Sequence, residues 1–262
     1  MKILEPSSHI HIACCLLGMA GGAAAAAPDG RLFNPGRAWL ERYDPTLVSS
    51  RYFSEFIFES YHGDGDLYKN ENTLRWGIPW RDDHALGIQA MLPLKWREVA
   101  GDEEFGLGDL ELRAGIVGRI TPTLRYGVGV NAVLDSATDP LLGDSAFVLR
   151  PITALRWDWN ANVTLGINVE YNFTPLDENT DDVSALEVKF PVAFKISDDW
   201  SGYLSYNPRW NLLDESDRHR LELGTNLTWG ADNQYAWSIG TEVPLTSENF
   251  ELKLATGFSW YF

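Results

Sequence analysis

The sequence lacks several features that would point to common classes of protein. Its two cysteines, Cys14 and Cys15, both lie in an apolar run from Ile10 to Ala27, so the rest of the chain has no disulfide framework and no thiol nucleophile. After that run, no segment approaches the ~18 consecutive apolar residues of a membrane-spanning helix. The net charge of -16 also excludes the broad basic surface that nucleic-acid binding requires. We therefore expect no nucleic-acid partner.

Motifs of catalysis and cofactor binding are lacking as well. No serine stands in a nucleophile-elbow context, and no zinc-ligand spacing or phosphate-binding glycine loop is present. Beyond the apolar run the histidines are His62, His84 and His219. His219 follows Asp214 and Asp217 closely, which leaves a hydrolase site at an outer rim open, although a histidine in an acidic loop is ordinarily solvated. We expect no cofactor, no metal and no enzymatic activity.

What the sequence does contain is alternation of apolar and polar residues with a period of two, from Arg51 to Phe262. In a clear example, Leu112 and Ile116 alternate with Glu111 and Arg113. Counting such runs gives about twelve strands, an even number typical of bacterial membrane barrels. The 13% aromatic content is high for a chain that is not hydrophobic on average, as expected when only the outer face meets lipid. The predicted fold is all-β, a single antiparallel transmembrane β-barrel over residues 51–262.

Short and long connections alternate between the predicted strands, as expected when short turns face the periplasm and longer loops face outward. The predicted strands begin near Arg51, Thr73, Ala85, Asp109, Arg125, Ser145, Val163, Ala185, Ser201, Arg220, Tyr235 and Phe250. The long connections span residues 62–72, 97–108, 136–144, 174–184 and 211–219, and they hold much of the negative charge. These acidic loops are either simply solvated or bridged by divalent cations to lipopolysaccharide phosphates.

The end of the chain carries a resemblance. The last strand alternates through Phe258, Trp260 and Phe262, and the glycine–aromatic–aromatic ending of Gly257, Trp260 and Phe262 resembles the terminal strand of bacterial outer-membrane β-barrels. That resemblance implies that these three residues are read by the outer-membrane assembly machinery. It also implies a location in the bacterial outer membrane, in contact with its lipid and lipopolysaccharide.

The first fifty residues divide into two predicted segments. The alanine-rich run ends in small residues and is too short for a membrane span, so residues 1–27 are predicted to be a secretory signal peptide, cleaved near residues 25–27. Residues 28–50 include Phe33, Trp39 and Tyr43. They are predicted to form a periplasmic arm, a plug that enters the barrel, or a floppy tail.

The alternation also predicts which charged side chains point into the barrel. The lumen-lining set is Glu55, Arg75, Asp109, Glu111, Arg113, Arg119, Arg125, Asn131, Arg150, Arg156, Glu170, Glu187, Lys189, Lys195, Arg209, Glu222 and Glu242. Carboxylates prevail near the outer end and cations near the periplasmic end and at mid-height, so the charges are predicted to be partly separated along the axis. Such charges either form a translocation path or pair with one another and fill the bore.

A more specific resemblance lies between Met91 and Leu112. A proline-containing strand, a charged loop, and then Gly106-Leu107-Gly108-Asp109-Leu110 resemble the family named after the meta pathway of phenol degradation. Members of that family are regarded as outer-membrane transporters of small, often aromatic or apolar compounds. The resemblance covers about a tenth of the chain and implies no functional residue one by one.

Together these observations predict an outer-membrane channel or transporter, a porin-like barrel for the passive passage of small solutes, including small apolar or aromatic compounds. Two alternatives stay open. One is an enzyme at the extracellular rim, and the other is a structural or adhesive barrel whose acidic loops bind envelope components. The sequence specifies neither the solute nor the oligomeric state.

Overall fold

The computed structural model describes residues 46, 49–61, 65–81, 83–99, 102–143, 145–175, 183–230, 233–246 and 250–262. The predicted signal peptide and most of residues 28–50 lie outside this part of the chain, as do His62 and several acidic loop residues. The elements are β1 (Arg51–Tyr61), β2 (Gly65–Arg81), β3 (His84–Val99), β4 (Asp102–Leu107), β5 (Glu111–Thr121), β6 (Leu124–Val133), η3 (Pro140–Leu142), β7 (Val148–Asp158), β8 (Val163–Phe173), β9 (Ser184–Lys195), β10 (Trp200–Asn211), β11 (Asp217–Trp229), β12 (Tyr235–Pro244) and β13 (Phe250–Tyr261).

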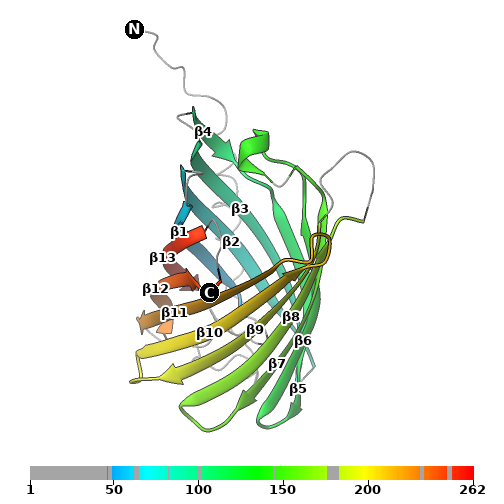
Figure 1. Ribbon diagram of the computed structural model, residues 1–262. Helices are drawn as coiled ribbons and strands as arrows, with labels where there is room; N and C mark the ends of the chain where they lie inside the picture. The colour runs from blue at the N-terminus through cyan, green and yellow to red at the C-terminus, as the bar shows by residue number, and fades with distance from the viewer. Residues whose placement is uncertain are drawn as a thin grey trace.

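Twelve of the described strands close into an antiparallel barrel (Figure 1). Each strand pairs with its neighbours in chain order, and the ring closes because β1 pairs with β13 over its whole length, from Arg51 opposite Tyr261 to Tyr61 opposite Phe250. Closure leaves no open edge, so every strand finds backbone partners without water. The predicted fold class and the predicted number of membrane strands are confirmed.

The remaining strand, β4, lies outside the ring and pairs with the outer end of β3. It continues in β5 after a break at residues 108–110. The pairing changes there from Leu94 opposite Leu107 to Met91 opposite Glu111, which leaves one extra residue on the β4–β5 side. This is a β-bulge, and it bends the long strand at the rim (Figure 1).

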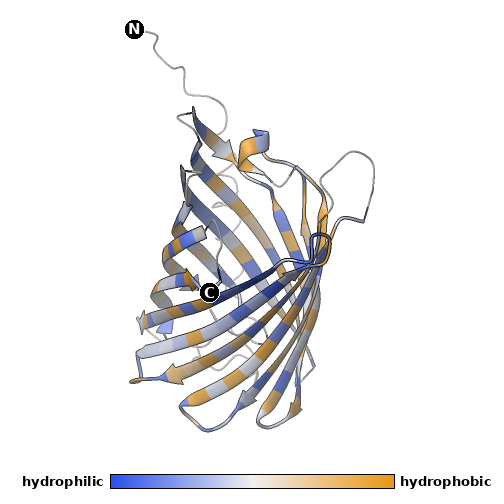
Figure 2. Cartoon of the chain, in the orientation of Figure 1, coloured by the Kyte–Doolittle hydropathy of each residue, from blue (hydrophilic) through white to orange (hydrophobic). Residues whose placement is uncertain are grey.

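Alternate residues along each strand point to opposite sides of the wall, which Figure 2 shows as alternating colours. Outward positions carry exposed apolar side chains such as Phe56, Ile120 and Val128, which are 64%, 57% and 54% exposed. Aromatic side chains gather at the turn ends, where Trp229 lies 6.0 Å from Tyr235 and Trp157 lies 4.9 Å from Trp159. An apolar outer face flanked by aromatic residues is the surface of a membrane barrel.

Short turns lie at one end of the barrel and the longer connections at the other (Figure 1). All the predicted strand starts except the one near Thr73 lie within three residues of an observed strand start. At the turn after β11, Gly230 adopts a φ of 89°. This is the left-handed region that glycine enters without steric cost. None of the described residues forms a helix long and apolar enough to cross a membrane.

Two of the predicted loops are wrong. The connection predicted over residues 62–72 is largely strand, because β2 begins at Gly65. Its outward residues are polar but satisfy one another: Tyr52 donates to Asn72 at 2.6 Å and Asn70 donates to Ser54 at 3.1 Å. The connection predicted over residues 97–108 is the β3–β4 hairpin. Charged residues can occupy a strand wherever other polar groups or water satisfy them. Such a strand lacks the apolar alternation, so a hydropathy pattern does not reveal it.

Candidate functional site

The interior of the barrel is the candidate site. Residues paired directly across an antiparallel ladder lie on the same face of the sheet. Tracing such pairs around the ring from the buried Glu55 places sixteen of the predicted lumen residues on the inner face. They are Glu55, Arg75, Glu111, Arg113, Arg119, Arg125, Asn131, Arg150, Arg156, Glu170, Glu187, Lys189, Lys195, Arg209, Glu222 and Glu242. Asp109 lies in the bulge between β4 and β5 instead.

A cavity of about 300 Å³ lies inside the barrel, and it brings together seven of these predicted residues from strands far apart in the ring. They are Glu55, Arg75, Arg113, Glu170, Glu187, Lys189 and Glu222. The other lining residues are Arg51, Phe53, Ile152, Asn168, Pro191, Tyr203 and Ser205. Four cationic and four acidic side chains therefore face one space, and any selectivity must come from how they are arranged.

The cations form a row across half of the barrel. Successive direct pairs join Arg51 to Arg75, Arg75 to Gln89, Gln89 to Arg113, Arg113 to Asn131, and Asn131 to Arg150. We call Arg51, Arg75, Arg113 and Arg150 the arginine row. It crosses the six contiguous strands β1, β2, β3, β5, β6 and β7, and no carboxylate interrupts it.

The arginine row is only partly neutralised. Arg75 Nε donates to Gln89 Oε1 at 3.3 Å, and Arg150 Nη1 lies 3.5 Å from Glu111 Oε1. Arg51 is 4% exposed and lies over the Phe53 ring at 5.4 Å. The Nε atoms of Arg51 and Arg113 have no hydrogen-bond acceptor among the described residues. Buried guanidinium nitrogens ordinarily have an acceptor, so these two Nε donors without one are unusual.

Acidic side chains prevail on the other half of the ring. Glu170 of β8 pairs directly with Glu187 of β9, and Glu222 of β11 pairs with Glu242 of β12. Lys189 lies 3.0 Å from Glu187. The sequence predicted separation of charge along the axis, whereas the register separates the mid-height charges around the circumference. The reason is that strand tilt and register, which alternation does not encode, decide which residues share a level.

The periplasmic end is filled by a tight polar network around Arg125, which is 1% exposed. Its Nη1 and Nη2 donate to the two carboxylate oxygens of Asp158, each at 3.2 Å. Asp158 also accepts from the Thr164 hydroxyl at 3.0 Å. Arg125 Nε donates to Thr46 Oγ1 at 3.2 Å, and Thr46 is fully buried. Thus one described residue from the segment before the first strand lies inside the barrel.

Other predicted cations at this end are held by their own neighbours. Arg156 Nη1 donates to the backbone oxygens of Leu155 and Ile167, at 2.8 and 3.3 Å. Lys195 Nζ contacts Asp198 Oδ1 at 2.6 Å, and Arg119 Nη1 lies 4.0 Å from Asp83. These three side chains therefore bind groups of the barrel wall and of its short turns.

At the outer end, Asp109 fastens a loop to the rim. Its Oδ1 accepts from the backbone nitrogens of Ser136 and Ala137, both at 3.0 Å. Thr138 adds a second tie, since its backbone nitrogen donates to Leu107 O at 2.9 Å. Two further predicted residues also lie near this end. Glu242 lies 3.0 Å from Arg220, and Arg209 lines a small cavity with Arg218.

The histidine considered for a rim enzyme has both ring nitrogens engaged. His219 Nε2 lies 2.7 Å from Asp217 Oδ2, and its Nδ1 lies 2.6 Å from the Tyr206 hydroxyl. Asp214 instead accepts from the Ser216 backbone nitrogen at 2.9 Å, and these hydrogen bonds from Ser216 lower the pKa of Asp214. Within the described residues no group of His, Cys, Asp and Glu could hold a metal ion.

The predicted assembly residues lie on the strand that closes the ring. Gly257 faces inward and pairs with Glu55 of β1, whereas Trp260 and Phe262 belong to the outward set and their rings lie 5.4 Å apart. The Phe262 backbone nitrogen donates to Ser50 O at 3.1 Å, so the closing seam extends beyond β1.

The sequence pattern missed several inner residues. Arg51 has the same strand parity as Glu55 but stands at the first position of its strand. Asp158 occupies the last inner position of β7, next to the following turn. Lys69, on a segment predicted as loop, lies 3.0 Å from Glu59. A parity count carried one residue further at each strand end would have identified the first two.

No protein-family model matches the chain, and no curated protein sequence matches it. Solved structures do resemble it. The crystal structure of the COG4313 outer membrane channel from Pseudomonas putida F1 has a TM-score of 0.70 at 14% identity, covering 82% of this chain and 96% of that one. The KdgM porin has a TM-score of 0.56 at 9% identity, covering 81% and 99%. The CymD monoaromatic hydrocarbon channel has a TM-score of 0.54 at 10% identity, covering 88% and 94%.

These likenesses show the fold of the chain, which is that of bacterial outer-membrane β-barrels. The solved neighbours named above are channels and a porin. The apolar outer face of the closed ring agrees with that fold, because such a surface is stable against lipid and unfavourable in water. The chain is therefore an outer-membrane β-barrel, in contact with the lipid of that membrane.

Proposed function

We propose that this barrel is a passive channel for small solutes across the outer membrane. The single observation that carries the proposal is the interior cavity, which is lined by polar and charged side chains from seven strands. A barrel that served only as a scaffold or an adhesin would gain more from a bore filled with paired side chains. The channels among its structural neighbours support the same function.

The segment before the first strand supports a narrow rather than a wide channel. Thr46 lies buried against Arg125 at the periplasmic end, which favours the plug over the free arm for the part of residues 28–50 nearest the barrel. A narrow bore lined by opposed charges suits a solute-selective channel better than a general porin.

The family resemblance suggests small apolar or aromatic solutes, and the CymD monoaromatic hydrocarbon channel has the same fold. The cavity supports only part of that suggestion. Eight ionic side chains line it, and a wholly apolar solute would displace their hydration without replacing the lost hydrogen bonds. We propose that the solutes carry a polar or charged group in addition to any apolar part.

The function is tested by recording single-channel currents in planar bilayers. The barrel is purified from outer membranes, and currents are measured in potassium chloride with and without replacement of Arg113 or Arg150. Steady conductance that changes with these substitutions is expected. A correctly folded barrel that stays silent under every applied voltage would overturn the channel.

The two alternatives predict different results. For a rim enzyme, His219→Ala must abolish a hydrolytic activity, and any substrate would have to displace the Tyr206 hydroxyl or Asp217 from the ring nitrogens of His219. For an adhesive barrel, removal of the acidic loop charges must abolish envelope binding while lumen substitutions have no effect.

We also propose that Gly257, Trp260 and Phe262 form the assembly signal. Replacing Phe262 by Ser should lower the amount of folded barrel in outer membranes. The control Trp229→Ser, which removes another aromatic side chain at the turn end of the barrel, should lower it less.

A further inference from the structure

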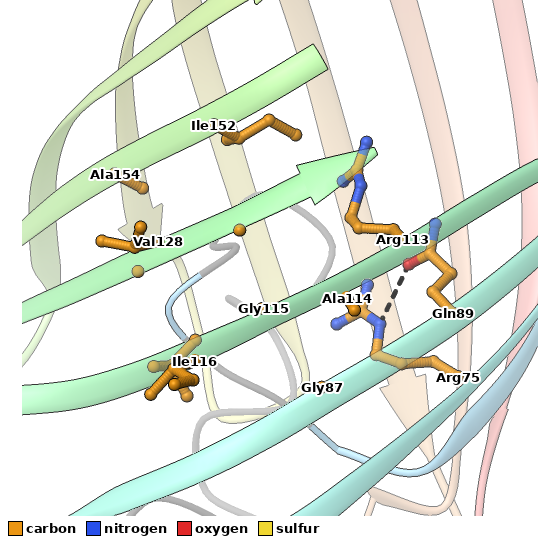
Figure 3. Close-up of a pocket in the computed structure, with 13 residues that line it drawn as sticks. Arg75, Gly87, Gln89, Arg113, Ala114, Gly115, Ile116, Val128, Ile152 and Ala154 are labelled. Carbon is orange, nitrogen blue, oxygen red and sulfur yellow. Dashed lines mark hydrogen bonds between the residues drawn. The ribbon is translucent and has the colours of Figure 1, made fainter. Parts of the chain in front are cut away.

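A second, smaller cavity of about 80 Å³ adjoins the arginine row (Figure 3). Figure 3 shows Arg75, Gln89 and Arg113 on one side of it and Val128 and Ala154 on the opposite side. Its lining contains two guanidinium groups and one amide, and no carboxylate. All its other lining residues are apolar: Gly87, Ala114, Gly115, Ile116, Val117, Gly127, Val128, Gly129, Ile152 and Ala154.

Glycine forms the floor of this pocket because the strands approach closely there. Gly87 pairs with Gly115, and Gly115 pairs with Gly129. A Cβ added at Gly115 would lie 2.9 Å from Val128 O, and one added at Gly129 would lie 2.7 Å from Ala114 O. Packing thus explains the glycines. Their consequence is a flat apolar backbone surface that faces the lumen without side chains.

The ionic side chains that line the pocket beside this surface are both positively charged. Arg113 has no hydrogen-bond or ion-pair partner among the described residues, and its buried Nε lacks an acceptor. One hydrogen bond of Arg75 is made to the neutral Gln89. The carboxylate of Glu111 is held by Arg150 at 3.5 Å and by Asn131 at 2.7 Å, and Glu170 faces Arg113 across the larger cavity. The pocket therefore presents positive charge next to an apolar floor.

We propose that this pocket is a binding subsite for an amphipathic monocarboxylate, with the carboxylate on Arg75 and Arg113 and an aromatic ring or short apolar chain on the glycine floor. This inference rests on the proposed function and names its solute class. Guanidinium groups bind carboxylates through paired, charge-assisted hydrogen bonds, and a flat apolar surface accepts the face of a ring. Binding must be weak, because a solute that passes through has to leave again.

The test is isothermal titration calorimetry on the folded barrel in detergent, with three small ligands. Benzoate has both the ring and the charge, benzyl alcohol lacks the charge, and acetate lacks the ring. We expect benzoate to bind at least about tenfold more tightly than either of the others, because only benzoate uses both halves of the pocket. Equal binding of benzoate and acetate, or of benzoate and benzyl alcohol, would overturn the proposal.

Substitutions locate the site. The double variant Arg75→Gln/Arg113→Gln should weaken benzoate binding about tenfold and leave benzyl alcohol unchanged. Arg218→Gln, which removes one positive charge from the outer end, should change benzoate binding less than about twofold. Unchanged benzoate binding in a folded double variant would overturn the assignment. Should the double variant fail to fold, Arg113→Lys replaces it, and a loss of about threefold is expected because lysine cannot bind both carboxylate oxygens.

The calorimetry and the bilayer recordings separate this inference from the channel function. A conducting barrel that binds benzoate no better than acetate would keep the channel and refute the subsite. A silent barrel that binds benzoate with the expected ligand order would refute the channel and support the subsite.

Discussion

Two arginines on neighbouring strands differ in what surrounds them. Arg125 of β6 is 1% exposed, is bonded to both oxygens of Asp158, and donates to Thr46. Arg113 of β5 faces the same lumen and makes no hydrogen bond or close ion pair among the described residues. Both positions read the same in the sequence, as a cation on the inner face of a strand. Arg125 is bound to the barrel wall by its ion pair with Asp158. Arg113 forms no such pair and is therefore available to a solute.

The strongest test of this comparison removes the partner of Arg125. Asp158→Asn should destabilise the barrel by about 3–5 kcal/mol, because it leaves a buried guanidinium without its counter-charge. Arg113→Gln should change stability by less than about 1 kcal/mol, because it removes no partner. Urea unfolding in lipid vesicles, followed by tryptophan fluorescence, measures both. Equal losses in the two variants would abolish the distinction.

The contact with Thr46 gives the next largest effect. Thr46→Ala removes the hydroxyl that accepts from Arg125 Nε, and the hydrogen bond to this charged group predicts a loss of about 1.5–3 kcal/mol. The same unfolding measurement applies. Ser49→Ala, which also precedes the first strand, serves as the control and should cost less. A Thr46 variant as stable as the parent would show that the segment before β1 contributes nothing to the network.

Neutralising the charges of one half of the ring at a time tests the comparison at the level of function. Arg75→Gln/Arg113→Gln should shift ion selectivity towards cations, and Glu170→Gln/Glu187→Gln should shift it towards anions. The shifts are expected to be severalfold in the permeability ratio and smaller at high salt. Reversal potentials across a salt gradient measure them. Shifts of the same sign in both variants would contradict a division of charge around the circumference.

The smallest effect concerns a turn. The hydrogen bond and the charge of Lys195 lower the pKa of Asp198 below its ordinary value of 3.8. Because the folded-state pKa is depressed, the ion pair stabilises the fold above the ordinary pKa and is lost as pH falls through the folded value. The stability of the parent barrel should therefore drop slightly more than that of Asp198→Asn between about pH 6 and about pH 3. Identical pH profiles would show that this exposed pair contributes nothing.

The fold was predictable to a large extent because membrane strands must alternate. Strand starts such as Arg51, Val163 and Tyr235 are the same in the prediction and in the structure. Alternation failed where its physical basis is weak. Asn70 and Asn72 lie on the outer face but satisfy each other and their neighbours, and the strand that carries them was assigned to a loop.

The candidate site was predictable in its residues but not in its arrangement. Parity assigned Arg113, Glu170 and Lys195 to the inner face, and the register places them there. Parity gave no information on which of these side chains lie close to one another. Arg113 and Glu170 line one cavity across the lumen, while Lys195 is bound by its own turn through Asp198. The inner role of Thr46 left no trace in the alternation, because residue 46 precedes the first strand.

The sequence by itself predicted that the chain forms a barrel, because about twelve runs with a period of two, each apolar on one face, are typical of strands with one side in lipid. It also predicted most of the residues that face the lumen, but missed Arg51, Asp158 and Lys69. Only the tertiary structure decided which charges neutralise one another. That depends on the tilt and register of twelve strands, and shifting one strand by two residues would keep every side chain on its face while changing every neighbour.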